Sequence, residues 1–460
     1  MAKKLLRPFG VKDEMGYVCG DMAGSFVNLY VDAYFLTFCT YVLGIDPKWM
    51  AGLFLCARLW DAVNDVIMGT FPDRWQLGKT GDKFKPWVKV FMIPLALSGV
   101  LCFSNVPLQG IALHAWVAFS YVLYGMSYTG TSIPFGAMAS VVSDNPVDRS
   151  KLSRARSIGG TIVGIGALSF VPVICFDKNS NILPERFTML AVGFGVLSIV
   201  CYLLMMHLTQ ERIHQPAKSG EKFEYKKVLS AAFRNRQLVG VMVATIGSML
   251  FITGGSQLNS YIYKECFQNT QAMTVSSLAN LVIIAVCFPL VPWLVKRFGK
   301  RNVILVMSAY CFVLSLFKLV FVIENVWVYT AIYCLSMIGQ TAFTMLIWAL
   351  VTDCLDYSEW KFNLRSDGSM YSLYTFSRKI GSTIASTGAA SALAAIGYVA
   401  GTNVVQSSET VQNIYYLVNA VPVVTCVLEL IGIGLIFNLT KKDTEEMYAE
   451  LHKKRAQQAQ

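Results

Sequence analysis

The sequence predicts an all-α integral membrane protein, and two observations lead to that fold class. Hydrophobic residues make up 55% of the 460 residues and charged residues only 15%, whereas soluble domains carry about 25% charged residues. The deficit of charge also runs through nearly the whole chain instead of being confined to one segment. This composition excludes a soluble globular enzyme, a disordered protein and a disulfide-rich secreted scaffold.

Twelve apolar stretches have the length of about 20 residues that crosses a bilayer as a helix. They predict helices over residues 16–43, 50–71, 87–104, 111–142, 155–176, 187–208, 238–262, 273–295, 302–323, 327–352, 370–400 and 412–438. The loops between them are short, except for one polar segment in the middle of the chain. We therefore predict an N-terminal six-helix bundle (1–209), a central loop (210–237), a C-terminal six-helix bundle (238–440) and a tail (441–460).

The basic residues predict the orientation of these helices. Of the 39 Lys and Arg residues, 31 lie in the segments on the same side as the N-terminus, and the opposite loops hold only Lys48, Lys178, Arg186 and Lys264. Because loops rich in Lys and Arg stay in the cytoplasm, we predict a multi-pass protein of the inner cell membrane with both termini cytoplasmic. The net charge of +11 is then a topology signal, and no nucleic-acid partner is expected.

Two halves of six spans joined by a long cytoplasmic loop are typical of the major facilitator fold, whose halves are related by a pseudo-twofold axis. Two loops support such a repeat. Asp73-Arg74 and Gly78-Lys79 follow the second span, and the basic run 296–301 lies at the matching point after the eighth span.

Motifs of enzyme active sites and metal centres are absent from the sequence. The 12 cysteines lie singly without a Cys-x-x-Cys pair, the four histidines are scattered, and no Gly-x-Ser-x-Gly, P-loop or Gly-x-Gly-x-x-Gly motif occurs. We expect the thiols to be free and to pack as small apolar groups. No enzymatic activity and no organic cofactor are expected.

Ionisable residues inside membrane spans are costly and usually mark a functional site. They include Asp21, Asp32, Arg58, Asp61, Asp65, Lys318, Arg378, Lys379 and Glu429. In the second span, Arg58, Asp61, Asn64 and Asp65 are spaced three and four apart, so they share one helix face. This face is either a static ion-pair network or a cation site. One arginine does not neutralise two aspartates, and a hydroxyl such as that of Thr129 would complete a set of oxygen ligands for Na⁺, whereas a proton needs only a carboxylate.

The remaining charges have several interpretations. Neighbours on a helix point about 100° apart, so at most one of Arg378 and Lys379 faces a central cavity. We treat Lys318 and Glu429 as structural, with Glu429 either paired with Lys318 or protonated. Asp32 lies three turns after Asp21, and either lines the pathway or lies near the lipid headgroups.

Several motifs resemble one family, the glycoside–pentoside–hexuronide:cation symporters. The matching segments are Gly20-Asp21, 57–65 with Met68-Gly69, 83–87, 124–129, 133–135, 353–360, Arg365, Gly368 and 376–379. The match runs through the whole chain in register.

The resemblance implies a sodium site at Asp61, Asn64, Asp65 and Thr129. From the charged residues themselves we expect a charge network that includes Arg58, Arg378 and Lys379. The resemblance also implies a sugar-binding carboxylate at Asp21, a polar residue near the sugar at Thr375, and a lysine that couples cation and sugar sites at Lys379. From the residues themselves, the rings of Tyr128 and Trp348 are candidates for stacking on a sugar.

Three positions differ from the family's pattern. Ser132 replaces a second sugar-binding aspartate, and Gly136 replaces a tryptophan. The family's sugar-binding arginine aligns with Ser157, one residue from Arg156, which we place at the cytoplasmic end of its span. We include Ser132 among the candidate substrate-binding residues, and we expect poor transport of α-galactosides such as melibiose.

These features predict a cation-coupled symporter, driven by Na⁺ or H⁺, that transports a sugar or glycoside by alternating access and acts as a monomer in the bilayer. The alternative is a major facilitator carrier of amphipathic lipids or of another non-sugar solute. A sugar sensor that does not transport is less compatible with a retained cation site.

Overall fold

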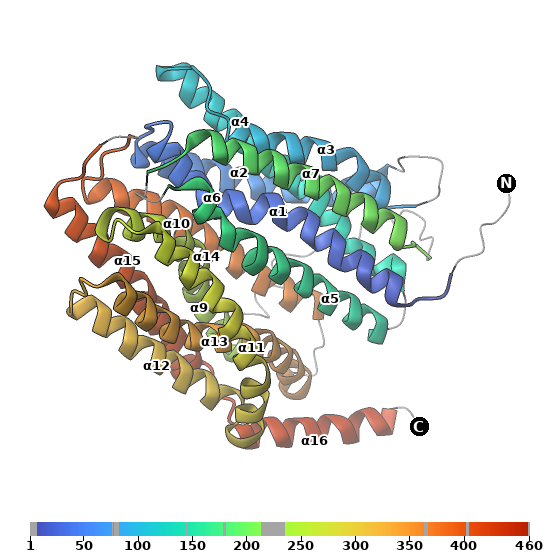
Figure 1. Cartoon of the computed structure of the whole chain (residues 1–460). Coiled ribbons are helices and arrows are strands. Elements are labelled where there is room, and N and C mark those ends of the chain that lie inside the picture. The colour runs from blue at the N-terminus through green and yellow to red at the C-terminus, as the bar shows by residue number, and fades with distance from the viewer. Residues whose placement is uncertain are drawn as a thin grey trace. The chain divides into compact units, whose positions relative to one another are not determined.

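The computed structural model describes residues 7–75, 77, 82–143, 146–177, 181–212, 235–362, 367–401 and 404–458. Within these ranges the protein is built from helices (Figure 1), and the single pairing of extended backbone is a bridge between Phe176 and Ile182. The expected all-α class is confirmed. The chain forms two compact units: unit 1 comprises Met1–Lys222 with Val399–Val404, and unit 2 comprises Phe223–Tyr398 with Val405–Gln460.

Unit 1 is organised around its first helix. Its helices are α1 (Val11–Tyr41), α2 (Pro47–Arg74), α3 (Lys85–Cys102), α4 (Gly110–Val142), α5 (Pro146–Thr161), α6 (Val171–Cys175) and α7 (Pro184–Leu208). Helix α1 packs against α5 and α7, α3 packs against α4 and α7, and α2 packs against α4. Aromatic rings pack between α1, α3 and α7, and the stacked rings of Tyr30 and Phe103 have centroids only 4.2 Å apart.

The start of α3 is held by an acidic residue from the end of unit 1. The carboxylate of Glu211 accepts hydrogen bonds from the backbone N–H groups of Lys83 (2.6 Å), Phe84 (3.0 Å) and Lys85 (2.8 Å). They lie at and just before the start of α3, where a helix leaves its first N–H groups without a partner in the helix. Burial raises the pKa of the Glu211 carboxyl, and the three N–H donors oppose that rise.

The fifth expected span, 155–176, is a helical run with two irregular segments. Helix α5 continues through a π-helical segment (Ile162–Ala167) and a 3₁₀ turn (Leu168–Phe170) into α6. The sequence gives a reason for the irregularity. Pro172 has no N–H to donate to the carbonyl of Leu168, so the regular ladder is interrupted, and such interruptions produce π and 3₁₀ adjustments.

Unit 2 contains the remaining helices. They are α9 (Arg236–Met249), α10 (Ser256–Tyr261), α11 (Thr270–Phe298), α12 (Lys300–Val320), α13 (Val326–Phe362), α14 (Asp367–Ala395), α15 (Ser408–Glu429) and α16 (Lys441–Gln458), with π-helical segments at Leu250–Gly255, Ile262–Cys266 and Leu430–Ile436. Helix α12 packs against α13 and α15, α9 packs against α14 and α15, and α11 packs against α13.

Each of the twelve expected spans coincides with one helix or helical run. By length and composition, eight helical runs among the described residues are apolar enough to cross a membrane. The four expected spans outside this group are α1, α2, α4 and α14. With the exception of Trp348 on α13, these four helices carry all the predicted site residues. Charged and hydroxyl side chains lower the hydropathy of a helix, so the predicted site residues contribute to the weaker apolar signal.

The segment 441–460, expected as a tail, forms helix α16 through Gln458 and docks on unit 2. A reciprocal capping box starts the helix: Thr440 N–H donates to Asp443 Oδ2 (2.9 Å), and Asp443 N–H donates to Thr440 Oγ1 (3.3 Å). Such a box satisfies two backbone donors at a helix start. Met447 and Leu451, four residues apart on one face, are buried.

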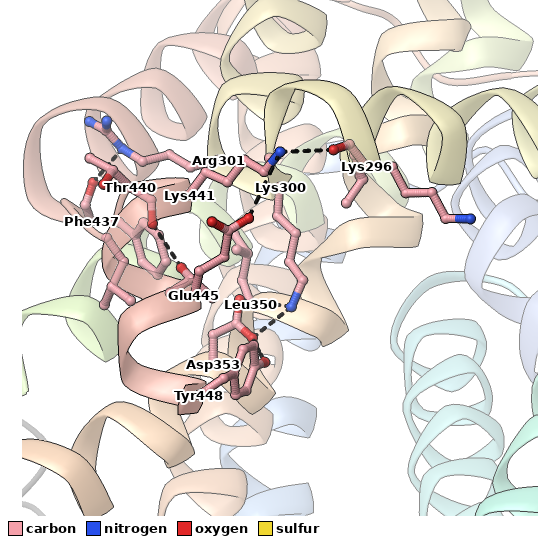
Figure 2. Close-up of a pocket in the computed structure, with 14 residues that line it drawn as sticks. Lys296, Lys300, Arg301, Leu350, Asp353, Phe437, Thr440, Lys441, Glu445 and Tyr448 are labelled. Carbon is pink, nitrogen blue, oxygen red and sulfur yellow. Dashed lines mark hydrogen bonds and ion pairs between the residues drawn. The ribbon is translucent and has the colours of Figure 1, made fainter. Parts of the chain in front are cut away.

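Polar contacts tie α16 to the rest of unit 2 (Figure 2). Asp353 of α13 is buried, accepts from Lys300 Nζ at 2.7 Å and accepts from the hydroxyl of Tyr448 at 2.6 Å. Lys441 Nζ donates to the carbonyl of Lys296 at 2.9 Å. These residues line a cavity of about 260 Å³ between the ends of α11, α12 and α16. The tail helix is therefore an integral part of unit 2.

Gly299, which joins α11 to α12, generates a prediction about stability. Its φ of +82° and ψ of 155° lie in a region that is essentially restricted to glycine, and a Cβ there would lie 2.8 Å from Lys441 Cβ. We expect Gly299→Ala to lower the free energy of unfolding by about 1–3 kcal/mol and to lower the melting temperature of the detergent-purified protein. Gly388→Ala, on α14 with open space around its Cβ position, is the control. Equal melting temperatures for the two variants would contradict the prediction.

Candidate functional site

The predicted cation-site residues come together between α2 and α4. The hydroxyl of Thr129 donates to Asp65 Oδ1 at 3.2 Å. Asn64, one residue earlier on α2, is buried, and its amide nitrogen has no hydrogen-bond partner among the described residues. A buried amide donor without a partner is unusual in a folded protein. The unused hydrogen-bonding capacity of Asn64 is that of a donor, because the atom without a partner is the amide nitrogen.

Asp61 lies one turn before Asp65 on α2 and closely approaches α4. A Cβ on Gly125 of α4 would lie 2.8 Å from Asp61 Oδ1. Because glycine has no Cβ, the carboxylate can lie this close to α4 without a clash. On its other side, Asp61 Oδ2 lies 4.0 Å from a guanidinium nitrogen of Arg58. The expected shared face of α2 thus presents two carboxylates, an amide and a guanidinium.

Arg58 also reaches α1, where it contacts Asp32. The guanidinium of Arg58 lies 3.5 Å from Asp32 Oδ1, and Asn28 Nδ2 donates to Asp32 Oδ2 at 3.1 Å. Tyr124 of α4 in turn donates to Asn28 Oδ1 at 2.7 Å. The guanidinium is therefore shared between carboxylates of α1 and α2. Sequence reasoning left the role of Asp32 open and missed Asn28 and Tyr124, although Asn28 precedes Asp32 by one helical turn.

Asp21 lies in a second polar cluster, between α1 and α5. Arg156 Nε donates to Asp21 Oδ1 at 2.9 Å, and Ser25 Oγ lies 3.5 Å from Asp21 Oδ2. From the sequence we placed Arg156 at the cytoplasmic end of its span and did not predict this contact. Ser157, the residue that aligns with the family's arginine, is exposed and bonds its hydroxyl to the Ser153 carbonyl of its own helix.

Two residues of α4 position the Arg156 side chain. Its guanidinium lies over the ring of Phe135, 5.5 Å from the centroid, within the range of a cation–π interaction. A Cβ on Gly136 would lie 3.3 Å from a terminal nitrogen of Arg156. A tryptophan at this position would therefore compete with Arg156 for space, which gives a physical reason for the absence of that tryptophan in this chain.

The other predicted substrate residues of α4 lie on either side of Thr129. The Tyr128 ring stacks with Tyr124 at a centroid distance of 6.2 Å. Ser132 is half-buried. Tyr128 thus contacts the cluster of Asn28 and Asp32 through Tyr124.

The remaining predicted site residues belong to unit 2. On α14, Thr375 and Arg378 are half-buried and Lys379 is exposed. The side chain of Trp348 on α13 lies outside the described residues, as does Arg365.

Lys318 and Glu429 are both buried in unit 2 and do not form an ion pair with each other in the part of the chain that the structure describes. The Lys318 ammonium lies 5.4 Å from the ring centroid of Tyr329 and 5.0 Å from that of Tyr333. Glu429 bonds to Ser308 and Gln340 instead. Of the two arrangements proposed for Glu429 from the sequence, pairing with Lys318 is therefore wrong.

This arrangement of apolar helices with polar clusters inside them defines the class of protein. It is a multi-pass membrane transporter with the major facilitator fold. A nucleoside transporter of known structure superposes with a TM-score of 0.61 at 14% identity, over 93% of this chain and 99% of that one. This likeness concerns the fold.

The family follows from sequence comparison. Residues 16–441 match the model of the MFS/sugar transport protein family, and the chain belongs to that family. The isoprimeverose transporter of Lactiplantibacillus pentosus is 29% identical over 97% of this chain and 92% of its own. The glucuronide carrier protein homolog of Escherichia coli is 28% identical over 96% of each chain. The resemblance to the glycoside–pentoside–hexuronide:cation symporters is confirmed, and these relatives are transporters and not enzymes.

Asn64 generates a prediction because its amide nitrogen is buried without a partner. Replacing an unsatisfied polar group by an apolar one of similar shape removes a penalty of about 1–3 kcal/mol. In Na⁺-free buffer, Asn64→Leu is expected to keep or raise the melting temperature of the purified protein.

The matched control is Asn419→Leu. Asn419 is also buried, but it accepts from the Tyr329 hydroxyl at 3.2 Å and donates to the Tyr415 carbonyl at 2.9 Å. This variant should lose stability. A similar loss of stability in both variants would contradict the prediction.

Proposed function

We propose that this chain is a sugar symporter driven by a cation that binds between α2 and α4. The observation that carries the proposal is the contact between Thr129 and Asp65, with the carboxylate of Asp61 one turn earlier on α2 and close to Gly125 of α4. Carboxylate, amide and hydroxyl oxygens are the ligands that hard cations prefer. The four residues Asp61, Asn64, Asp65 and Thr129 are the proposed ligands.

We favour Na⁺ over a proton as the coupling ion. A proton would need a single carboxyl group, whereas the four proposed ligands offer side-chain oxygens from two helices. Arg58 is shared between Asp32 and Asp61, and Asp65 contacts the hydroxyl of Thr129 on α4, a group whose oxygen Na⁺ also accepts as a ligand.

Cation and sugar binding would be coupled through α1 and α2. A bound cation reduces the repulsion between Asp61 and Asp65 and fixes the α2 face, which Arg58 links to Asp32 of α1, the helix that also carries Asp21. By linkage, cation and sugar should raise each other's affinity by the same factor, typically about 5–150-fold or 1–3 kcal/mol. On the strength of the family resemblance, we assign Lys379 as the countercharge that allows the empty carrier to reorient by alternating access.

We further propose that unit 1 and unit 2 are the two six-helix bundles. The protein would act as a monomer in the inner cell membrane, with the central loop and both termini in the cytoplasm. The distribution of 31 of 39 basic residues on one side of the expected spans supports this orientation.

Asp65→Cys is predicted to separate coupling from transport. Without the carboxylate the cation site is lost, so proteoliposomes should no longer accumulate sugar above equilibrium in a Na⁺ gradient, while exchange of sugar down its own gradient persists. Asp46→Cys, at the exposed N-cap of the same helix, is the control and should accumulate sugar. Continued accumulation by Asp65→Cys would show that the site is structural.

For the substrate, we propose a sugar or glycoside that carries a carboxylate. Arg156 forms an ion pair with Asp21, and 45% of its side chain is exposed. It can therefore contact a ligand while remaining paired with Asp21. Ser132 supplies no competing negative charge. A glucuronide carrier homolog is among the relatives.

Arg156→Gln is predicted to distinguish charged from neutral sugars. A hydrogen bond to a charged group contributes about 1.5–3 kcal/mol, so uptake of a glucuronide should fall about 10–100-fold, whereas uptake of a neutral glycoside should change little. The control is Arg154→Gln on the same helix, which removes a more exposed arginine that pairs with Glu14. Robust uptake of melibiose by the unsubstituted protein would overturn this substrate assignment.

A further inference from the structure

A carboxyl group that the symport mechanism does not use lies in the interior of unit 2. Glu429 of α15 is fully buried. The hydroxyl of Ser308 on α12 donates to Glu429 Oε2 at 2.7 Å, and Gln340 Nε2 on α13 donates to the same oxygen at 3.2 Å. Three helices of unit 2 therefore meet at one oxygen of this carboxyl.

The other oxygen of the carboxyl is buried without a donor. Glu429 Oε1 has no hydrogen-bond partner among the described residues, and neither has Gln340 Oε1, the carbonyl oxygen of the amide that contacts Glu429. Both atoms are acceptors. Buried polar atoms are nearly always hydrogen-bonded, so the site lacks a donor. A proton on Glu429 Oε1 supplies that donor.

The surroundings of Glu429 also disfavour a negative charge. Lys318 on α12, the buried cation of this region, lies over the rings of Tyr329 and Tyr333 and forms no ion pair with Glu429 in the described chain. The nearby titratable groups are the thiols of Cys311 on α12 and Cys426 on α15, whose sulfurs lie 3.8 and 3.7 Å from Gln340 Nε2. An ionised carboxylate without a paired cation is strongly unfavourable in such an interior.

The same surroundings favour a proton over a metal cation. Na⁺ requires several oxygen ligands, but the groups around this carboxyl include two sulfurs and the amide nitrogen of Gln340, whose hydrogens would face the cation. Hard cations select oxygen. A proton needs only one carboxyl oxygen.

We propose that Glu429, Gln340 and Ser308 form a proton-binding site in unit 2, separate from the cation site of unit 1, with the proton on Glu429 Oε1. The proton allows the carboxyl to hold α12, α13 and α15 together without a buried charge. Loss of the proton introduces that charge at the contact of the three helices, so transport should slow at alkaline pH.

Infrared difference spectroscopy of the purified full-length protein, unsubstituted minus Glu429→Gln, tests the site. Glutamine resembles the protonated carboxyl in shape and keeps an N–H donor, so the variant should fold. At neutral pH we expect the carbonyl stretch of a protonated carboxylic acid, which the variant should lack. The band should not change when Na⁺ is added, and it should disappear at alkaline pH. Absence of the band, or its loss when Na⁺ is added at constant pH, would overturn the proposal.

Sugar exchange in proteoliposomes, measured without a cation gradient, tests the consequence for transport. The exchange rate of the unsubstituted protein should fall at alkaline pH in proportion to the loss of the infrared band, and that of Glu429→Gln should stay constant. Glu409→Gln, at the exposed start of the same helix, should behave as the unsubstituted protein. Identical pH profiles for Glu429→Gln and the unsubstituted protein would overturn the assigned effect on transport. Because exchange requires no cation gradient, this result is independent of the proposed Na⁺ coupling.

Discussion

A charged side chain inside a membrane-spanning helix needs partners from the protein, because hydrocarbon supplies none. Unit 1 meets this constraint by sharing one guanidinium: Arg58 contacts Asp61 on its own helix and Asp32 on α1. Polar side chains extend the arrangement, since Asn28 binds Asp32 and Tyr124 binds Asn28. Helices α1, α2 and α4 are thus connected through polar contacts as well as through apolar packing.

Two glycines of α4 provide the space for charged side chains of the neighbouring helices. Gly125 allows Asp61 to lie against α4, and Gly136 leaves room for Arg156 beside Phe135. At both positions a larger residue would meet a charged group, so substitution would alter electrostatics and packing together. The shape of the proposed binding region therefore depends on α4 as much as on the charged helices α1 and α2.

The helices and the shared polar face of α2 could be predicted from local sequence patterns, whereas the sugar-site candidates Asp21, Thr375 and Lys379 followed from the family resemblance. Apolar stretches mark the spans, and three- and four-residue spacing places Asp61, Asn64 and Asp65 on one face. Contacts between helices could not be predicted from these local patterns. The pairing of Arg156 with Asp21 depends on how closely α5 approaches α1, and the bond from Gln340 to Glu429 joins residues 89 positions apart. The docking of α16 likewise depends on a buried surface that unit 2 provides only when folded.

The pairing of Arg58 with Asp32 also bears on how the chain enters the membrane during synthesis. Arginine and aspartate each cost about 2.5–3.5 kcal/mol at the centre of a helix that is inserted alone, and α2 contains Arg58, Asp61 and Asp65. Helix α1 leaves the ribosome first and carries Asp32, which contacts Arg58 in the folded unit. Helix α2 is therefore expected to partition into lipid as a hairpin with α1, so that one contact serves both biogenesis and the finished transporter.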